Sequence, residues 1–162
     1  MDQLLAKAIA KQREGADYYG SIARSHAQNA LREVFALLAE DEKRHEMILQ
    51  AAKDHLPIPL QDDGTRQKVA NLFSDLEEQK ADIPAPIEQV DVYRAAWEVE
   101  KQSVALYEQL FDKCGDEESR ALYAFLIDQE KMHMEVMESL YQHVNRPNEW
   151  VESAEFGLRE EY

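Results

Sequence analysis

Two halves of this 162-residue chain repeat one another at a constant shift of 88 residues, and this repeat constrains the fold more than any other feature. The repeat needs no gap, and it includes polar residues that are awkward to bury. The matching pairs are Ala8 with Ala96, Tyr19 with Tyr107, Arg32 with Arg120, Ala36 with Ala124, Leu38 with Leu126, Glu42 with Glu130, Lys43 with Lys131, and His45 with His133. Such a repeat indicates two copies of one supersecondary unit that pack against each other.

Apolar residues recur at helical spacing along each copy, and glycine and proline are scarce, with five of each in the chain. This pattern predicts two long helices in each copy. The predicted helices span residues 2–27, a segment that Asn29 caps and that runs to about His55, residues 88–113, and a segment that Asp116 caps and that runs to about Val144, where Asn145-Arg146-Pro147 ends it.

A long connection joins the two pairs of helices. Residues 56–87 carry proline pairs at both ends, and residues 65–79 between them predict a short amphipathic helix. Because the turn within each pair is short, the helices of a pair should run antiparallel. We therefore predict an all-α protein, an antiparallel four-helix bundle of two helical hairpins over residues 1–145, with a C-terminal tail over 146–162 that has room for a short helix.

The most informative motif is Glu-x-x-His, which occurs at matching places in both copies as Glu42-x-x-His45 and Glu130-x-x-His133. Residues three apart lie on one face of a helix, so the carboxylate and the imidazole can reach the same metal ion. One such motif in a charged helix is weak evidence, whereas two at equivalent positions of a repeat are strong. The alternative is that all four are surface residues of charged helices.

The first and third predicted helices face these motifs across the two hairpins. Residues equidistant from the turn of an antiparallel hairpin lie at the same height, and Glu130 and Glu100 both lie 15 residues from Gly115. The same arithmetic pairs Glu42 with Gln12, and the repeat independently relates Gln12 to Glu100. One layer of the bundle is thus predicted to hold Gln12, Glu42, His45, Glu100, Glu130 and His133.

Buried carboxylates in such a layer are costly without partners, and divalent cations supply the missing charge. Three carboxylates and two histidines suit two metal ions, with two of the carboxylates free to bridge them. Oxygen and nitrogen ligands without a thiolate favour iron or manganese over copper or structural zinc. For Gln12, the alternative roles are a hydrogen bond to a ligand and plain packing.

On these residues the chain resembles the ferritin-like di-iron carboxylate proteins, and rubrerythrin-like proteins most closely. In that family a Glu from each of two helices joins a Glu-x-x-His from each of the other two. Residues 97–107 are similar to the third helix of the family, with Tyr107 seven residues after Glu100, and residues 8–19 are similar to the first. The resemblance covers about 140 residues. It implies a ferritin-like bundle, two iron ions (manganese or zinc as alternatives), peroxide or dioxygen as reactant, an electron donor that we do not identify, and a homodimer.

The chain departs from the family pattern in three ways. Gln12 stands where the first helix should carry a Glu ligand, and Glu46, one turn beyond Glu42, is a candidate substitute. Ser103 stands where the rubrerythrin pattern carries a further Glu ligand. A rubredoxin module needs four cysteines, and this chain has Cys114 alone.

Two tyrosines and one charged run need an interpretation beside the ligands. Tyr19 and Tyr107 lie two turns from the ligand positions on the same face, where they can hydrogen-bond the ligands, take a redox role or serve as core aromatics. We favour core aromatics. The run from Glu40 to Arg44 is expected to form a solvated face with ion pairs one turn apart.

The composition excludes several classes of protein. A formal net charge of -15 repels a phosphate backbone, which argues against binding to nucleic acid. No apolar run approaches the roughly 18 residues that a membrane span needs. The N-terminus lacks the basic start and long apolar run of a secretory signal, and a lone cysteine is typical of a reducing compartment, so we expect a cytoplasmic protein.

The functional hypothesis from the sequence is a di-iron oxidoreductase that reduces peroxide or dioxygen, or that oxidises ferrous ion. The first alternative is iron binding or storage without turnover. The second is a non-enzymatic helical interaction module with a degenerate metal site. A third is oxygen-dependent hydroxylation of an organic substrate, which would need a deep pocket that reaches the metal layer.

Overall fold

The computed structural model of the chain describes residues 1–25, 30–78 and 87–157. These residues form five helices and no strand. The helices are α1 (Asp2–Ser25), α2 (Ala30–Lys53), α3 (Thr65–Glu78), α4 (Ile87–Lys113) and α5 (Glu117–Gly157). None of the helices in this described part is long and apolar enough to cross a membrane.

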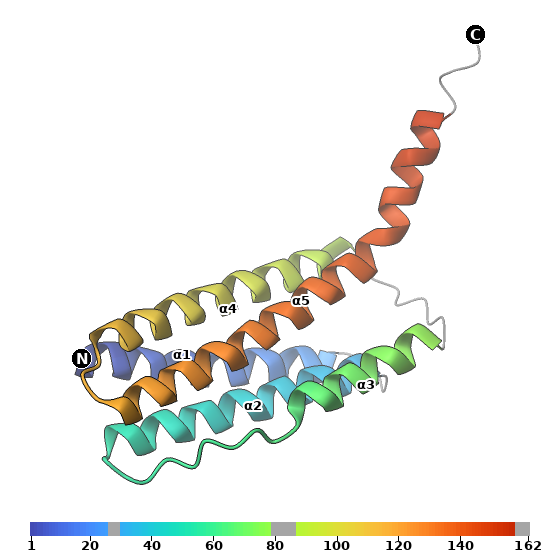
Figure 1. The fold of residues 1–162 in the computed structure, drawn as a ribbon. Coiled ribbons are helices and arrows are strands. Elements are labelled where there is room, and N and C mark those ends of the chain that lie inside the picture. Colours follow the sequence, from blue (N-terminus) through green and yellow to red (C-terminus); the bar gives the residue numbers. More distant parts are fainter. Residues whose placement is uncertain (26–29, 79–86, 158–162) are drawn as a thin grey trace.

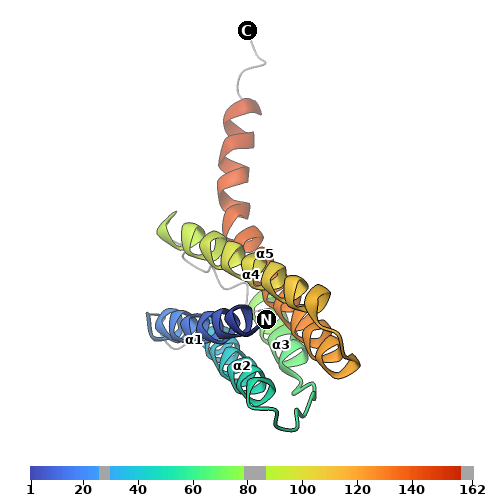
Figure 2. The same ribbon diagram turned by 90° about the vertical axis from the view of Figure 1, so that its left-hand side faces the viewer.

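The helices form two antiparallel hairpins, one of α1 with α2 and one of α4 with α5 (Figure 1). Figure 2 shows the same four-helix bundle from the end that carries the N-terminus. Helix α3 packs along α2, where Val69 is buried in the core and Leu72 and Phe73 pack against it. The predicted all-α, ferritin-like bundle with a short helix in the crossover is therefore confirmed.

The ends of two helices show why the chain turns where it does. Asp116 caps α5 as predicted, because its Oδ1 accepts a hydrogen bond of 2.7 Å from the backbone N–H of Ser119. At the end of α2, the N–H of Leu56 donates to the carbonyl of Ala51, and the N–H of His55 donates to the carbonyl of Ala52. This pair of bonds is a Schellman motif, and it places His55 in the left-handed region with φ 55°.

One predicted boundary is wrong. We expected Asn145-Arg146-Pro147 to end the last helix, but α5 continues to Gly157. The division into a bundle over 1–145 and a C-terminal tail over 146–162 stays a prediction. A proline removes one backbone donor from a helix, and the helix can continue past it with a bend. Figure 1 shows the second part of α5 leaving the bundle in a new direction. The predicted cap at Asn29 and the last residues, 158–162, lie outside the described part.

The core consists of two hydrophobic clusters separated by a polar layer. The first cluster includes Tyr19, Phe35, Tyr93 and Met137, and the second includes Leu49, Tyr107, Leu110 and Leu126. Along every helix of the bundle, residues of one cluster give way to buried polar residues and then to residues of the other cluster. These buried polar residues are Gln12, Asp41, Glu42, His45, Glu100, Ser103, Gln129, Glu130 and His133.

Candidate metal centre

Four side chains from three helices converge in the middle of the bundle. Glu42 comes from α2, Glu100 from α4, and Glu130 and His133 from α5, and each is at most 2% exposed. One ligand atom from each side chain lies within 4.8 Å of every other, which suits ligands arranged around one ion. We call these four residues the carboxylate cluster.

His133 directs its two ring nitrogens to different partners. Its Nε2 lies 2.9 Å from Oδ2 of Asp41, so it donates a hydrogen bond to that carboxylate. Its Nδ1 lies 2.9 Å from Oε1 of Glu42, 3.2 Å from Oε2 of Glu130 and 3.6 Å from Oε1 of Glu100. None of these three contacts has the geometry of a hydrogen bond, and Nδ1 has no such partner in the described part of the chain.

Unsatisfied buried atoms gather at this point. Oε1 of Glu42 and Oε2 of Glu130 also lack a hydrogen-bond partner among the described residues, although both are fully buried. Buried polar atoms are nearly always paired, and an exception needs an explanation. A bound cation explains all three atoms at once, because it takes an electron pair from each of them.

The two remaining residues of the predicted layer lie beside the cluster. Nδ1 of His45 is 3.2 Å from Oε1 of Gln12, and Nε2 of Gln12 donates a hydrogen bond of 2.8 Å to Oε1 of Glu130. The structure thus places all six predicted residues at one level, but only four present ligand atoms to a common point. Glu46, the candidate substitute for Gln12, forms an ion pair of 2.5 Å with the exposed Arg13 and is not part of the cluster.

Asp41 was interpreted wrongly from the sequence as part of a solvated face, whereas the side chain of Arg44 is 23% exposed and forms a predicted ion pair one turn away. The carboxylate of Asp41 is buried, and its Oδ1 forms an ion pair of 2.5 Å with Nη2 of Arg44. A signal was present, because Asp41 lies four residues before His45 and therefore on the same helix face. Because Asp41 lies within the charged run from Glu40 to Arg44, a solvent-exposed helix face was the more natural interpretation.

Arg44 connects this polar layer to the crossover. Its Nη1 donates to the backbone carbonyl of Gln61 at 2.9 Å, and its Nη2 donates to Oε1 of Gln129 at 3.0 Å and lies 3.5 Å from Oδ1 of Asp63. The connection after α2 is thereby joined to α5 through one guanidinium. The arginine also neutralises the carboxylate that orients His133.

Burial and mutual repulsion shift the protonation of the carboxylate cluster. Burial and the charge of Glu130 raise the pKa of Glu100 to about 7. Burial and the charges of Glu130 and Glu100 raise the pKa of Glu42 well above its usual range. For Glu130, burial acts to raise the pKa, but the nearby imidazoles of His133 and His45 outweigh it and hold the pKa low. Without a metal the cluster therefore retains protons near neutral pH, and a cation must displace them.

The histidine and its partner show the complementary effect. Burial alone would lower the pKa of His133, but Asp41 and the surrounding carboxylates raise it well above its usual value. Burial alone would raise the pKa of Asp41, but His133, His45 and Arg44 lower it. Asp41 is thus an anion that holds a proton on Nε2 of His133, which leaves Nδ1 facing the carboxylate cluster.

The two tyrosines differ in their relation to the cluster. The hydroxyl of Tyr19 donates a hydrogen bond to Oε1 of Glu100, so this residue is both a core aromatic and a partner of a candidate ligand. The hydroxyl of Tyr107 is buried and has no hydrogen-bond partner in the part of the chain described. Burial, followed by the charges of nearby carboxylates, raises the pKa of both phenols. Tyr107 therefore keeps the core role we favoured, whereas Tyr19 also positions a carboxylate.

Two small residues make room in the layer. Gly15 lies against Glu42, and a Cβ at this position would come within 3.1 Å of Oε2 of that carboxylate. At the repeat-related position, Ser103 is buried and its hydroxyl donates to the carbonyl of Val99, one turn earlier in its own helix. Ser103, which replaces a Glu of the family pattern, thus contacts its own backbone and is not part of the cluster.

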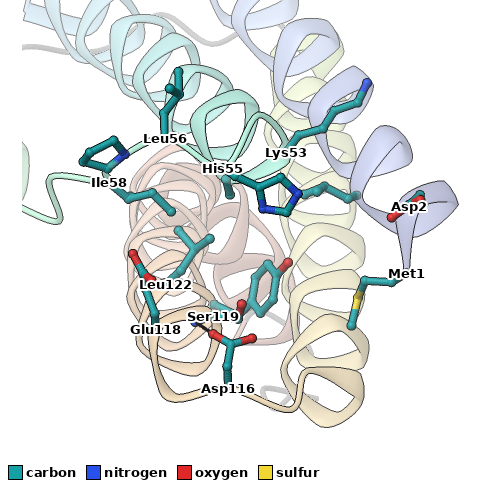
Figure 3. A pocket seen from close by; sticks show the side chains of 14 residues that line it. Met1, Asp2, Lys53, His55, Leu56, Ile58, Asp116, Glu118, Ser119 and Leu122 are labelled. Atoms are coloured by element: carbon teal, nitrogen blue, oxygen red, sulfur yellow. Dashed lines mark hydrogen bonds between the residues drawn. The ribbon is translucent and has the colours of Figure 1, made fainter.

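A cavity of about 780 Å³ lies at the end of the bundle, where the N-terminus, the end of α2 and the start of α5 meet (Figure 3). His55, Leu56, Asp116 and Leu122 are among its lining residues. No residue of the carboxylate cluster lines it. This cavity does not supply the deep pocket that hydroxylation of an organic substrate would require.

The donor set fits a hard divalent cation. Three carboxylates and one imidazole nitrogen, with no sulfur, are ligands that iron and manganese accept. Three atoms of the cluster without hydrogen bonds among the described residues lie close together, since Nδ1 of His133 is 2.9 Å from Oε1 of Glu42 and 3.2 Å from Oε2 of Glu130. The residues present therefore form a possible metal-binding group, which consists of four of the six side chains in the predicted layer.

The comparisons with known proteins agree with the geometry. No curated protein and no solved structure matches the chain. The family model of rubrerythrin matches residues 3–141, which include both hairpins and every residue of the carboxylate cluster. The chain therefore belongs to the rubrerythrin family.

Proposed function

We propose that this protein is an iron-dependent oxidoreductase that uses its carboxylate cluster to reduce peroxide or dioxygen, or to oxidise ferrous ion. The observation that carries the proposal is the convergence of four buried side chains, each with one ligand atom within 4.8 Å of the others. Three of these side chains also hold a buried atom with no hydrogen-bond partner in the described residues. The rubrerythrin family membership supports iron as the metal. Bound iron would supply the ferrous–ferric couple that the reaction needs.

The surrounding residues support this chemistry by holding ligands and protons. Asp41 orients His133 through Nε2, and Tyr19 donates to Glu100. Such partners of ligands commonly change metal affinity or activity by about 10- to 100-fold when they are removed. The two hydrophobic clusters on either side of the layer limit access of water.

The test is to load the protein with ferrous iron without oxygen, remove unbound iron and add peroxide. We expect retained iron by elemental analysis, loss of ferrous iron in a colorimetric chelator assay, and consumption of peroxide. The variants Glu42→Ala and Glu130→Ala should retain little iron, whereas the matched change Glu138→Ala on the exposed face of α5 should behave as wild type.

The result separates the functional alternatives. Iron that is retained but stays ferrous after peroxide would contradict the redox proposal and favour iron binding without turnover. Failure of the wild-type protein to retain any iron would favour the non-enzymatic module. Size measurement in solution tests the homodimer, which we propose from the family resemblance.

A further inference from the structure

The two halves of the metal centre, although related by the repeat, are not equivalent. The repeat relates His45 to His133, Gln12 to Glu100 and Asp41 to Gln129. On the His133 side, the layer therefore has the carboxylate of Glu100 as a candidate ligand and the carboxylate of Asp41 bonded to Nε2 of the histidine. On the His45 side, both of these positions are neutral amides.

On the His133 side, the imidazole is oriented to bind a cation. An ionised carboxylate can only accept hydrogen bonds, so Nε2 of His133 must carry a proton toward Asp41 at 2.9 Å. Nδ1 is then the nitrogen left for a metal, and it faces Glu42, Glu100 and Glu130 within 3.6 Å. A proton on Nδ1 would be displaced when a cation binds there.

On the His45 side, the ring also turns Nδ1 toward the cluster, where it lies 3.4 Å from Oε1 of Glu130, but here this nitrogen meets an amide as well. Glu130 accepts the hydrogen bond from Nε2 of Gln12, so the amide oxygen of Gln12 must be the atom that faces His45. A bare Nδ1 lone pair would repel this oxygen at 3.2 Å, and Nδ1 of His45 therefore carries a proton and donates a hydrogen bond to Oε1 of Gln12. The nitrogen that matches the metal-facing Nδ1 of His133 is thus engaged by an amide.

The other ring nitrogen of His45, Nε2, also lacks, among the residues described, a hydrogen-bonded carboxylate of the kind that Asp41 provides for His133. Nε2 of His45 has no hydrogen-bond partner in the described part of the chain and lies 3.8 Å from Oδ2 of Asp41. Gln129, at the position equivalent to Asp41, instead accepts a hydrogen bond from Arg44. Nothing therefore holds a proton on Nε2 and releases Nδ1, as Asp41 does for His133.

Charge bears on the second ion in particular. Three carboxylates with two dications would leave one excess positive charge in a buried site, and an uncompensated buried charge is costly. A fourth carboxylate at position 12 would remove that excess, but Gln12 is neutral.

We propose that this centre binds one divalent cation, held by Glu42, Glu100, Glu130 and His133, and that Gln12 closes the position of the second ion by bonding both His45 and Glu130. This differs from the two ions expected from the family resemblance. It adds the number of bound ions to the proposed function. It rests on the proposed function only because it takes the carboxylate cluster as the metal centre.

The experiment titrates the metal-free full-length protein with manganese(II) alone and counts bound ions by native mass spectrometry. Electron paramagnetic resonance distinguishes an isolated manganese ion from a coupled pair. We expect one ion per chain in the wild type and two coupled ions in Gln12→Glu, and more complete filling in Gln12→Glu/Gln129→Asp. Gln3→Glu is the matched control, because it adds the same charge on the exposed face of α1 and should still bind one ion.

A second pair of variants does not depend on the folding of Gln12→Glu. His133→Gln should weaken manganese binding at least 100-fold, whereas His45→Gln should change it less than about fivefold. Equal losses of manganese affinity in the two variants, or two ions bound to the wild type, would overturn the single-ion proposal. Neither result would decide whether bound iron is oxidised by peroxide, which is measured separately. One bound ion without iron oxidation would overturn the redox function alone.

Discussion

Asp41 on α2 accepts a hydrogen bond of 2.9 Å from Nε2 of His133 on α5, and this contact links the two hairpins behind the metal centre. The other oxygen of Asp41 bonds Arg44, which in turn holds the carbonyl of Gln61 in the crossover. The orientation of one candidate ligand is thereby connected to the loop that joins the two halves of the chain.

Asp41→Asn tests this contact. The substitution keeps the shape of the side chain but removes the charge that holds the proton on Nε2 of His133. We expect manganese affinity to fall about 10- to 100-fold, as for other partners of metal-binding histidines. Glu40→Gln is the control, because Glu40 is exposed and pairs with Lys43 at 2.7 Å. Competition with a metal-responsive dye measures the manganese affinity of both variants. If Asp41→Asn bound manganese as tightly as Glu40→Gln, the role of Asp41 would be contradicted.

Gly15→Ala tests the close approach of α1 to Glu42. The added Cβ would lie 3.1 Å from Oε2 of Glu42 and would push this carboxylate away from the ion position. We expect manganese affinity to fall at least tenfold. The comparison is Gly20→Ala in the same helix, where the Cβ meets only the flexible end of Arg24.

The Gly20→Ala change should leave metal affinity unchanged. It should raise the free energy of unfolding by about 0.5 to 1 kcal/mol, because alanine favours a helix over glycine. Chemical denaturation of the metal-free proteins measures this difference. If Gly15→Ala showed the same gain with unaltered metal binding, Glu42 would not need the space at Gly15.

The pKa of Glu100 predicts that the metal-free protein loses stability as pH rises. This pKa is about 7 in the fold against 4.5 for an ordinary Glu, so folding takes up a proton between these values. The raised pKa of His133 acts in the same direction, because its stabilising charge is present at low pH and lost as pH rises. The lowered pKa values of Glu130 and Asp41 act below this window.

We therefore expect the free energy of unfolding of the chelator-treated protein to fall by an amount on the order of 3 kcal/mol from pH 5 to pH 8. Urea denaturation at several pH values measures it. Glu100→Gln should flatten much of this dependence, and saturating manganese should raise stability most at the higher pH, since metal binding displaces the retained protons. A wild-type profile that rises with pH would contradict the prediction.

His55→Gly tests the end of α2. His55 has φ 55°, a conformation that costs an L side chain more than it costs glycine, and it occupies the position of the Schellman motif that glycine usually fills. We expect a gain of about 0.5 to 1 kcal/mol in the free energy of unfolding, measured by urea denaturation. His55→Ala should bring no such gain, and manganese affinity should stay the same in both variants. A gain of the same size in His55→Ala would show that backbone conformation is not the cause.

The helices and the level of the polar layer could be predicted from local patterns. Apolar spacing located α1, α2, α3 and α4 within a few residues, because helix periodicity is a short-range property of the chain. The last helix was predicted too short, since Pro147 is a breaker in most contexts but does not end α5 here. Asp41 was misjudged for a related reason: its local sequence is that of a solvated helix, and only the packing of α5 on α2 buries it.

The sequence alone was sufficient to predict one common height in the bundle for six residues: Gln12, Glu42, His45, Glu100, Glu130 and His133. This prediction needed only the repeat and the number of residues between each side chain and the turn of its hairpin. The sequence could not reveal which ring nitrogen of each histidine faces the others. That depends on contacts between helices far apart in the chain. Asp41 accepts a hydrogen bond from Nε2 of His133, and Oε1 of Gln12, a residue that also bonds Glu130, accepts one from Nδ1 of His45. Hydrogen bonds across the bundle have no signature in residue spacing, and for this reason the difference between the two halves of the centre emerged only from the folded arrangement.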